Sequence, residues 1–153
     1  MSHLAGALRS GMVLFMRTIL LAAVLAIGAG GGCSKSEPAK TAEKAKLPTI
    51  TVDEVDQKLA SGECVPVDAN GSETRKKMGV VPGAVLLTDS ESFQLAELPA
   101  DKSKALVFYC ANTRCGASHT AAEKAITAGY TNVKVMPDGI AGWVKAGKKV
   151  QSI

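Results

Sequence analysis

The chain has 153 residues, of which 46% are hydrophobic and 21% are charged, with a formal net charge of +4 at pH 7. This length suits one globular domain with a targeting segment and leaves no room for a second domain of ordinary size. Lysine and arginine are scattered and aromatic residues make up only 4% of the chain, so the sequence has neither the basic patch nor the stacking surface of a nucleic-acid-binding protein. We expect no nucleic-acid partner.

The N-terminal segment has the layout of a bacterial export signal. An unbroken apolar run at 18–27 follows Arg17 and precedes the small-residue stretch GAGGG in front of Cys33. The run is about half the ~20 residues that a membrane-spanning helix needs, which favours a cleaved signal over a permanent span. We therefore expect residues 1–32 to be the signal peptide, with Met16 as an alternative start.

Cys33 follows three glycines, as in the lipobox that it resembles. In bacterial lipoproteins, the signal peptidase cleaves before such a cysteine, whose thiol is diacylated. Gly30 stands where leucine is usual, so ordinary cleavage to a soluble periplasmic protein stays open. We expect a lipidated Cys33 that holds the protein to a membrane of the bacterial cell envelope, on its periplasmic side. The remainder of segment 33–46 is polar and lysine-rich, which predicts a flexible tether.

Helices and strands alternate in the pattern of residues 47–153. Thr51 and Glu54 form a capping box that predicts a helix from Thr51 to about Ser61. The other predicted elements are a strand at 64–69, a polar helix at 72–78, a strand at 84–87, a short helix at 92–97, a strand at 105–109, a helix at 118–128 capped by Ser118, a strand at 133–136 and a last helix that Trp143 anchors in the core. This alternation predicts one small α/β domain with a mainly parallel central sheet flanked by helices.

Cys110 is the first residue after the continuous apolar run ALVFY at 105–109, and a short loop leads from it to the helix that begins near Ser118. Ligands of an open parallel sheet bind at the C-terminal ends of its strands. Loop N–H groups and the helix dipole favour an anion there, and the same field stabilises a thiolate or a persulfide on Cys110. We expect a reactive thiol at Cys110, with a buried packing cysteine as the alternative.

Five segments carry a family resemblance over the whole of residues 47–153. They are VFYC at 107–110, the run from Ser118 to Trp143, AGKKV from Ala146, VDAN around Asp68, and VVPGA at 80–84. In this order they resemble the rhodanese family. The resemblance implies a rhodanese-like α/β fold in which Cys110 is the sulfur-carrying residue, and we expect Asp68 to support the site.

The loop after Cys110 departs from the family pattern. Typical members have six residues from the cysteine to an arginine just before the serine, whereas CANTRCGA is two residues longer and has Ala117 in the arginine's place. Arg114 is a candidate substitute, and Asn70 stands where the family often has another arginine. The expected substrate- and anion-binding loop comprises Ala111, Asn112, Thr113, Arg114, Gly116, Ala117 and Ser118.

Cys115 has two interpretations, a resolving thiol for Cys110 or a filler in a loop whose work is N–H donation. A short loop can bring the two sulfurs together, because a disulfide needs Cα atoms only within ~7 Å. Cys64 begins a predicted core strand and is expected to pack there. His119 adds a C-x4-C-x3-H spacing, but the sequence offers no fourth ligand, so we expect no metal and no cofactor.

Three functions remain after these considerations. The first is sulfur transfer, in which Cys110 forms a persulfide with a small sulfur donor or a thiol-bearing protein as partner. The second is thiol-disulfide exchange between Cys110 and Cys115, and the third is a catalytically silent binding module. The missing arginine weakens sulfur transfer from anionic donors such as thiosulfate, while the second cysteine favours exchange. We expect sulfur transfer as the activity.

Overall fold

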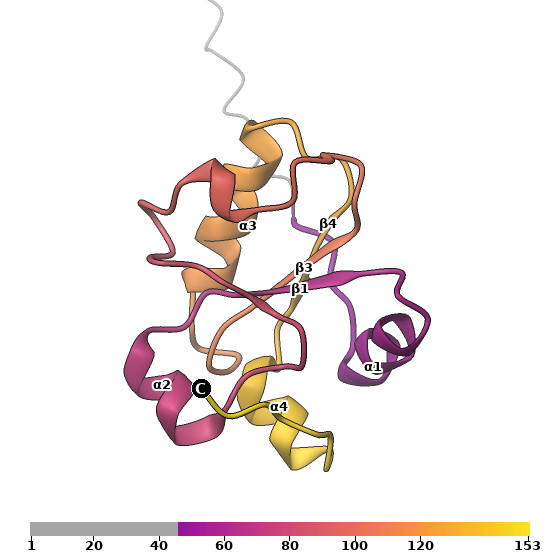
Figure 1. Ribbon diagram of the computed structural model, residues 1–153, viewed down its shortest axis with the longest axis vertical. Coiled ribbons are helices and arrows are strands. Elements are labelled where there is room, and N and C mark those ends of the chain that lie inside the picture. The colour runs from indigo at the N-terminus through magenta and orange to yellow at the C-terminus, as the bar shows by residue number, and fades with distance from the viewer. Residues whose placement is uncertain (1–45) are drawn as a thin grey trace, which may run out of the picture. The chain divides into compact units, whose positions relative to one another are not determined.

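The computed structural model describes residues 46–153 (Figure 1). The predicted signal peptide, Cys33 and nearly all of the predicted tether lie outside the described residues. No helix within residues 46–153 is long and apolar enough to cross a bilayer.

The centre of the domain is a four-stranded sheet in which every neighbouring pair is parallel. The strands are β1 (Val65–Asp68), β2 (Val85–Leu86), β3 (Leu106–Tyr109) and β4 (Val133–Met136). Their spatial order is β2-β1-β3-β4, so β3 lies inside the sheet between β1 and β4. This confirms the α/β class and the parallel sheet. Because all four strands run in the same direction, their C-terminal ends lie at one edge of the sheet. The sequence predicts the site at this edge.

The helices are α1 (Val52–Ala60), α2 (Ser72–Met78), α3 (Ala117–Thr127) and α4 (Gly139–Lys145), with a 3-10 turn η1 (Leu95–Glu97). The capping box of α1 is confirmed: the Glu54 N–H donates to Thr51 Oγ1 and the Thr51 N–H donates to Glu54 Oε2. The expected helix at 92–97 is reduced to η1. The Asp89 carboxylate accepts hydrogen bonds from the Ser92 N–H and hydroxyl, and this holds the chain in a turn instead.

Strand β3 divides the core in two, because its side chains alternate between the faces of the sheet. Leu106 and Phe108 pack with α3 on one face, while Val107 and Tyr109 pack with α1 and α4 on the other. In Figure 1, α3 is well separated from α1 and α4, as expected for helices that cover different faces of the sheet. All four β3 side chains are buried, which explains why this strand lacks charged residues.

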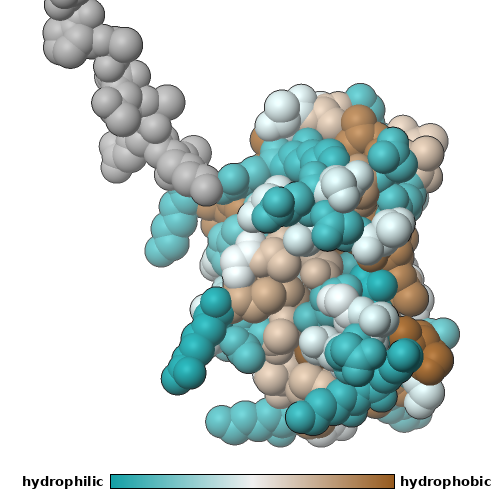
Figure 2. Space-filling view, turned by 90° about the vertical axis from the view of Figure 1, so that its left-hand side faces the viewer, coloured by the Kyte–Doolittle hydropathy of each residue, from teal (hydrophilic) through white to brown (hydrophobic). Residues whose placement is uncertain are grey.

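Two expectations about individual core residues are confirmed. Trp143 of α4 is buried, and its indole N–H donates to the carbonyl oxygen of Lys149 at 2.7 Å. Cys64 is buried in the core under α1 and α4, as expected for a packing residue. Hydrophilic side chains cover much of the face seen in Figure 2, in keeping with the scattered charge of the sequence.

Candidate active site

Cys110 lies directly after β3, at the C-terminal edge of the sheet, and is only 2% exposed. Its thiol donates to the carbonyl oxygen of Cys115 at 3.1 Å and lies 3.3 Å from the Ser118 hydroxyl oxygen. Its carbonyl oxygen accepts a hydrogen bond from the Ile140 N–H at the start of α4. Cys110 is thus fixed from both sides, by the loop through its sulfur and by α4 through its backbone.

The start of α3 corrects the predicted cap. The helix begins at Ala117 with Gly116 as its N-cap residue, and no side chain caps it. Ser118 is buried in the first turn of the helix, and its hydroxyl contacts the Cys110 sulfur and does not cap the helix. The first N–H groups of α3 consequently remain free to interact with the two sulfurs.

The loop folds back so that Cys115 meets Cys110. Asn112 shapes this turn: its carbonyl oxygen accepts the Cys115 N–H, and its side-chain oxygen accepts the Arg114 N–H, both at 3.0 Å. The two cysteines are free thiols, and the Cys110 thiol is hydrogen-bonded to the carbonyl oxygen of Cys115. The loop thus brings Cys115 against Cys110, while the approach of the two sulfurs to disulfide distance stays a prediction.

The two thiols differ in acidity. Burial, followed by the hydrogen bond with Cys115, raises the pKa of Cys110, and the Ser118 hydroxyl and N–H only oppose this rise. Burial also raises the pKa of Cys115, but the hydrogen bond with Cys110 and the N–H groups of Ala111 and Ala117 outweigh it and lower that pKa overall. N–H groups of the loop and of α3 thus act on both sulfurs, and at Cys115 they and the hydrogen bond with Cys110 outweigh burial.

Cys115 lies between two hollows of the surface. One is a cleft of about 500 Å³ that also has Leu47, Arg114 and His119 in its wall. The other is a pocket of about 290 Å³ at the strand ends, where Asn70 and Asp89 contribute to the wall. Among the described residues, Cys115 is shared by these two hollows, while Cys110 lines neither. Access from solution therefore leads to Cys115 first.

The remaining loop residues divide between solvent and the two hollows. Asn112, Thr113, Arg114 and Gly116 are exposed, while Ala111 and Ala117 are half-buried. Arg114, the candidate substitute for the missing arginine, lines the larger cleft, and its role toward an anion stays a prediction. Asn70 is buried at the wall of the smaller pocket.

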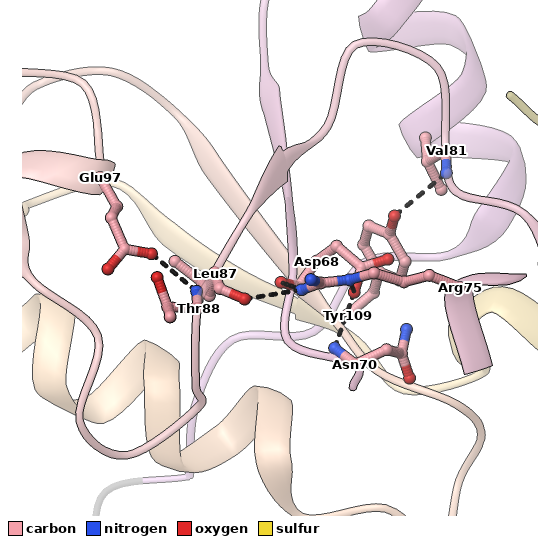
Figure 3. Close-up of polar contacts among 8 residues, drawn as sticks. All are labelled: Asp68, Asn70, Arg75, Val81, Leu87, Thr88, Glu97 and Tyr109. Carbon is pink, nitrogen blue, oxygen red and sulfur yellow. Dashed lines mark hydrogen bonds and ion pairs between the residues drawn. The ribbon is translucent and has the colours of Figure 1, made fainter. Parts of the chain in front are cut away.

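Asp68 supports the strand end and does not meet the sulfurs. It ends β1 and pairs in register with Tyr109, so its side chain shares the face of the sheet opposite to Cys110. Its carboxylate accepts from the Asn70 N–H at 2.7 Å and from Arg75 Nε at 3.1 Å (Figure 3). Burial, and then the negative charge of Asp68, raise the pKa of Tyr109, whose hydroxyl accepts a hydrogen bond from the Val81 N–H.

Arg75 is the supporting residue that sequence reasoning missed. Its Nη2 donates to the carbonyl oxygens of Asp68 and Leu87, at 3.0 and 2.8 Å, and so joins α2 to the ends of β1 and β2. The only sequence signal was its type, because arginine donates from two sides of a planar fork, whereas the neighbouring Lys76 and Lys77 each donate from a single ammonium group. No spacing rule connected it to Asp68.

Comparison with known proteins decides the family. The family model described as a rhodanese-like domain matches residues 51–146, which is more than half of the chain. The chain belongs to the rhodanese-like domain family. No curated protein matches it in sequence.

Solved structures share the fold of this rhodanese-like domain. The rhodanese-like domain of an Anabaena protein has a TM-score of 0.59 and 21% identity, over 71% of this chain and 81% of that one. The thiosulfate sulfurtransferase of Pseudomonas aeruginosa has a TM-score of 0.58 and 24% identity, over 69% of this chain and 20% of that one. A human single-domain sulfurtransferase has a TM-score of 0.51 and 23% identity, over 65% of this chain and 97% of that one. At these identities the likeness shows the fold.

Proposed function

We propose that this rhodanese-like domain transfers sulfane sulfur to a thiol acceptor, and that Cys110 is the residue that holds the sulfur as a persulfide. The observation that carries the proposal is a buried thiol at the end of β3, in contact with Ser118 and with a second free cysteine. Burial shields a persulfide at this position from water and from unrelated thiols. Sulfurtransferases among the solved structures of the same fold support this class of reaction.

The reaction has two steps of nucleophilic substitution at sulfur. In the first, a thiolate of the loop attacks the sulfane sulfur of a small donor, and the rest of the donor leaves with the bonding electron pair. In the second, the acceptor thiolate attacks the outer sulfur of the persulfide and restores the loop thiol. The acceptor is a small thiol or a cysteine of a partner protein. Neither step needs a cofactor.

Cys110→Ser tests this function. We expect transfer to the acceptor to fall to the uncatalysed background, because serine cannot form a persulfide. The free energy of unfolding should change by less than about 1 kcal/mol, since the substitution is nearly isosteric and the new hydroxyl has the Cys115 carbonyl and Ser118 as partners. Transfer is measured as the appearance of acceptor persulfide and stability by urea denaturation. A Cys110→Ser protein that transfers sulfur at the wild-type rate would contradict the proposal.

Thiol-disulfide exchange is the second candidate, and one observation favours it. The Cys110 thiol already contacts the backbone of Cys115 within one loop, and both thiols are free to form a disulfide. Equilibration in glutathione buffers of graded redox potential tests it. Formation of this disulfide at the potential of an oxidising compartment would support exchange, and thiols that stay reduced throughout would exclude it.

We also propose that the domain is held at a membrane through a lipidated Cys33, as its place after GAGGG indicates. Expressed in a Gram-negative host, the wild-type chain should fractionate with membranes. Cys33→Ser should release it into the periplasmic fraction, because the diacyl group has no attachment site. Immunoblots of the two fractions measure the distribution. Equal periplasmic solubility of wild type and variant would show that no lipid is attached.

A further inference from the structure

We infer that Cys115 is the receiving thiol of this site: it takes the sulfane sulfur from the donor and passes it to Cys110. The inference rests on the proposed sulfur transfer and adds an order to it. The chain position after β3 alone would assign the first attack to Cys110. The surroundings of the two sulfurs give the opposite assignment.

Access is the first argument for this order. Cys110 is 2% exposed and lines neither of the two hollows at the strand ends, within the part of the chain that the structure describes. Cys115 is partly exposed and contributes to the walls of both. A donor that approaches from either hollow therefore reaches the Cys115 sulfur without any rearrangement, whereas Cys110 is reached only after the loop opens.

The state of the sulfur atom is the second argument. The N–H groups of Ala111 and Ala117, on the two sides of the loop, point to the Cys115 sulfur and favour its negative charge. Ala117 is the first residue of α3, so the positive end of that helix acts in the same direction. Because the thiolate is the attacking species, the lowered pKa favours attack by the partly exposed sulfur of Cys115.

The charges of the two hollows indicate the class of donor. The larger cleft has two cationic side chains in its wall, Lys46 and Arg114, against the single carboxylate of Glu123. The smaller pocket has the Asp89 carboxylate, whose pKa is lowered by the N–H groups of Ser92 and Glu91, and no cationic side chain among the described residues of its wall. An anionic sulfane donor, such as thiosulfate, therefore fits the larger cleft.

The relay conserves atoms, electrons and protons. The Cys115 thiolate attacks the sulfane sulfur of thiosulfate, the donor's sulfur–sulfur bond breaks, and sulfite leaves with the electron pair. Cys110 then attacks the outer sulfur of the Cys115 persulfide. The new bond forms at Cys110, the bond within the Cys115 persulfide breaks, and the departing Cys115 sulfur takes up the proton that the Cys110 thiol loses. No external oxidant or reductant takes part.

The two cysteines can be followed separately by mass spectrometry. Trypsin cleaves after Lys104, Arg114 and Lys124, which places Cys110 on peptide 105–114 and Cys115 on peptide 115–124. The full-length chain is mixed with thiosulfate at pH 7, quenched at successive times with excess iodoacetamide, and digested. The added sulfur on each peptide gives the rate of loading at each cysteine, and released sulfite gives the overall rate.

Wild type should show sulfur first on Cys115 and later on Cys110. Cys115→Ala should load at least about tenfold more slowly, because the donor reaches the buried Cys110 sulfur only in the small fraction of molecules whose loop is open. Cys110→Ala should still load Cys115, more slowly than wild type because the hydrogen bond with Cys110 that lowers the pKa of Cys115 is lost, and the sulfur should stay on Cys115. Cys64→Ala, a matched control for a buried cysteine in the opposite core, should behave as wild type. Unfolding midpoints confirm that each variant is folded.

Two outcomes would overturn the inference, and they are distinguishable. If wild type loads sulfur and Cys115→Ala loads Cys110 equally fast, Cys110 makes the first attack and the order is wrong, while the proposed sulfur transfer stands. If no sulfur appears on either cysteine in wild type while sulfite release stays at background, the proposed function fails together with the inference.

Discussion

Replacement of Arg75 by alanine should lower the free energy of unfolding by about 3–5 kcal/mol, because it leaves a buried carboxylate without its counter-charge. The Asp68 side chain has no exposed surface and that of Arg75 is only 11% exposed, so water cannot take over the role of the guanidinium group. The same substitution removes hydrogen bonds to the carbonyl oxygens of Asp68 and Leu87. The ends of β1 and β2, which form the wall of the smaller pocket, then lose their connection to α2.

A matched control is available on the same helix. Lys77 is exposed, so Lys77→Ala should change stability by less than about 0.5 kcal/mol. Asp68→Asn in the Arg75→Ala background should restore at least about 1 kcal/mol, since the unpaired charge is then absent. Urea denaturation of the four proteins measures all of these values. An Arg75→Ala protein as stable as Lys77→Ala would show that the Asp68 charge is compensated in another way.

The elements that sequence reasoning predicted best depend on residues close together in the chain. The capping box of α1 needs only Thr51 and Glu54, three residues apart. The burial of β3 follows from an unbroken apolar run, and α2 was predicted with its observed bounds. Local rules suffice in these places, because the local hydrogen bonds and the tertiary contacts favour the same conformation.

The features that sequence reasoning predicted incorrectly depend on contacts between residues from different segments of the chain. Ser118 has the sequence position of a helix cap, but the sulfur of Cys110 competes for its hydroxyl and the cap moves to Gly116. The acidity of Cys115 depends on N–H groups from both ends of the loop, which spacing alone does not place. The meeting of the two cysteines could be predicted from loop length, whereas the assignment of their roles needed the burial of each sulfur.

Gly139→Ala should be the most damaging small substitution at the base of the site. Gly139 begins α4 with φ +61, a conformation that disfavours any residue with a β-carbon. A β-carbon there would also overlap the carbonyl oxygen of Cys110 and come within 2.7 Å of the carbonyl carbon of Ala111. These backbone atoms cannot move away freely, since the N–H groups of Ile140 and Ala141 are bonded to the same two carbonyl groups.

We therefore expect Gly139→Ala to lower the free energy of unfolding by more than about 2 kcal/mol and to slow sulfur loading. Gly147→Ala separates the two causes, because Gly147 has a similar φ of +71 but open space where its β-carbon would be. That control should lose only the conformational part, about 1 kcal/mol, and should load sulfur at the wild-type rate. Urea denaturation and the thiosulfate loading rate provide the two measurements. Equal losses of stability and equal loading rates for the two variants would mean that α4 can move away from Cys110 at little cost. Close packing of α4 against the loop would then not be what holds the thiol in place.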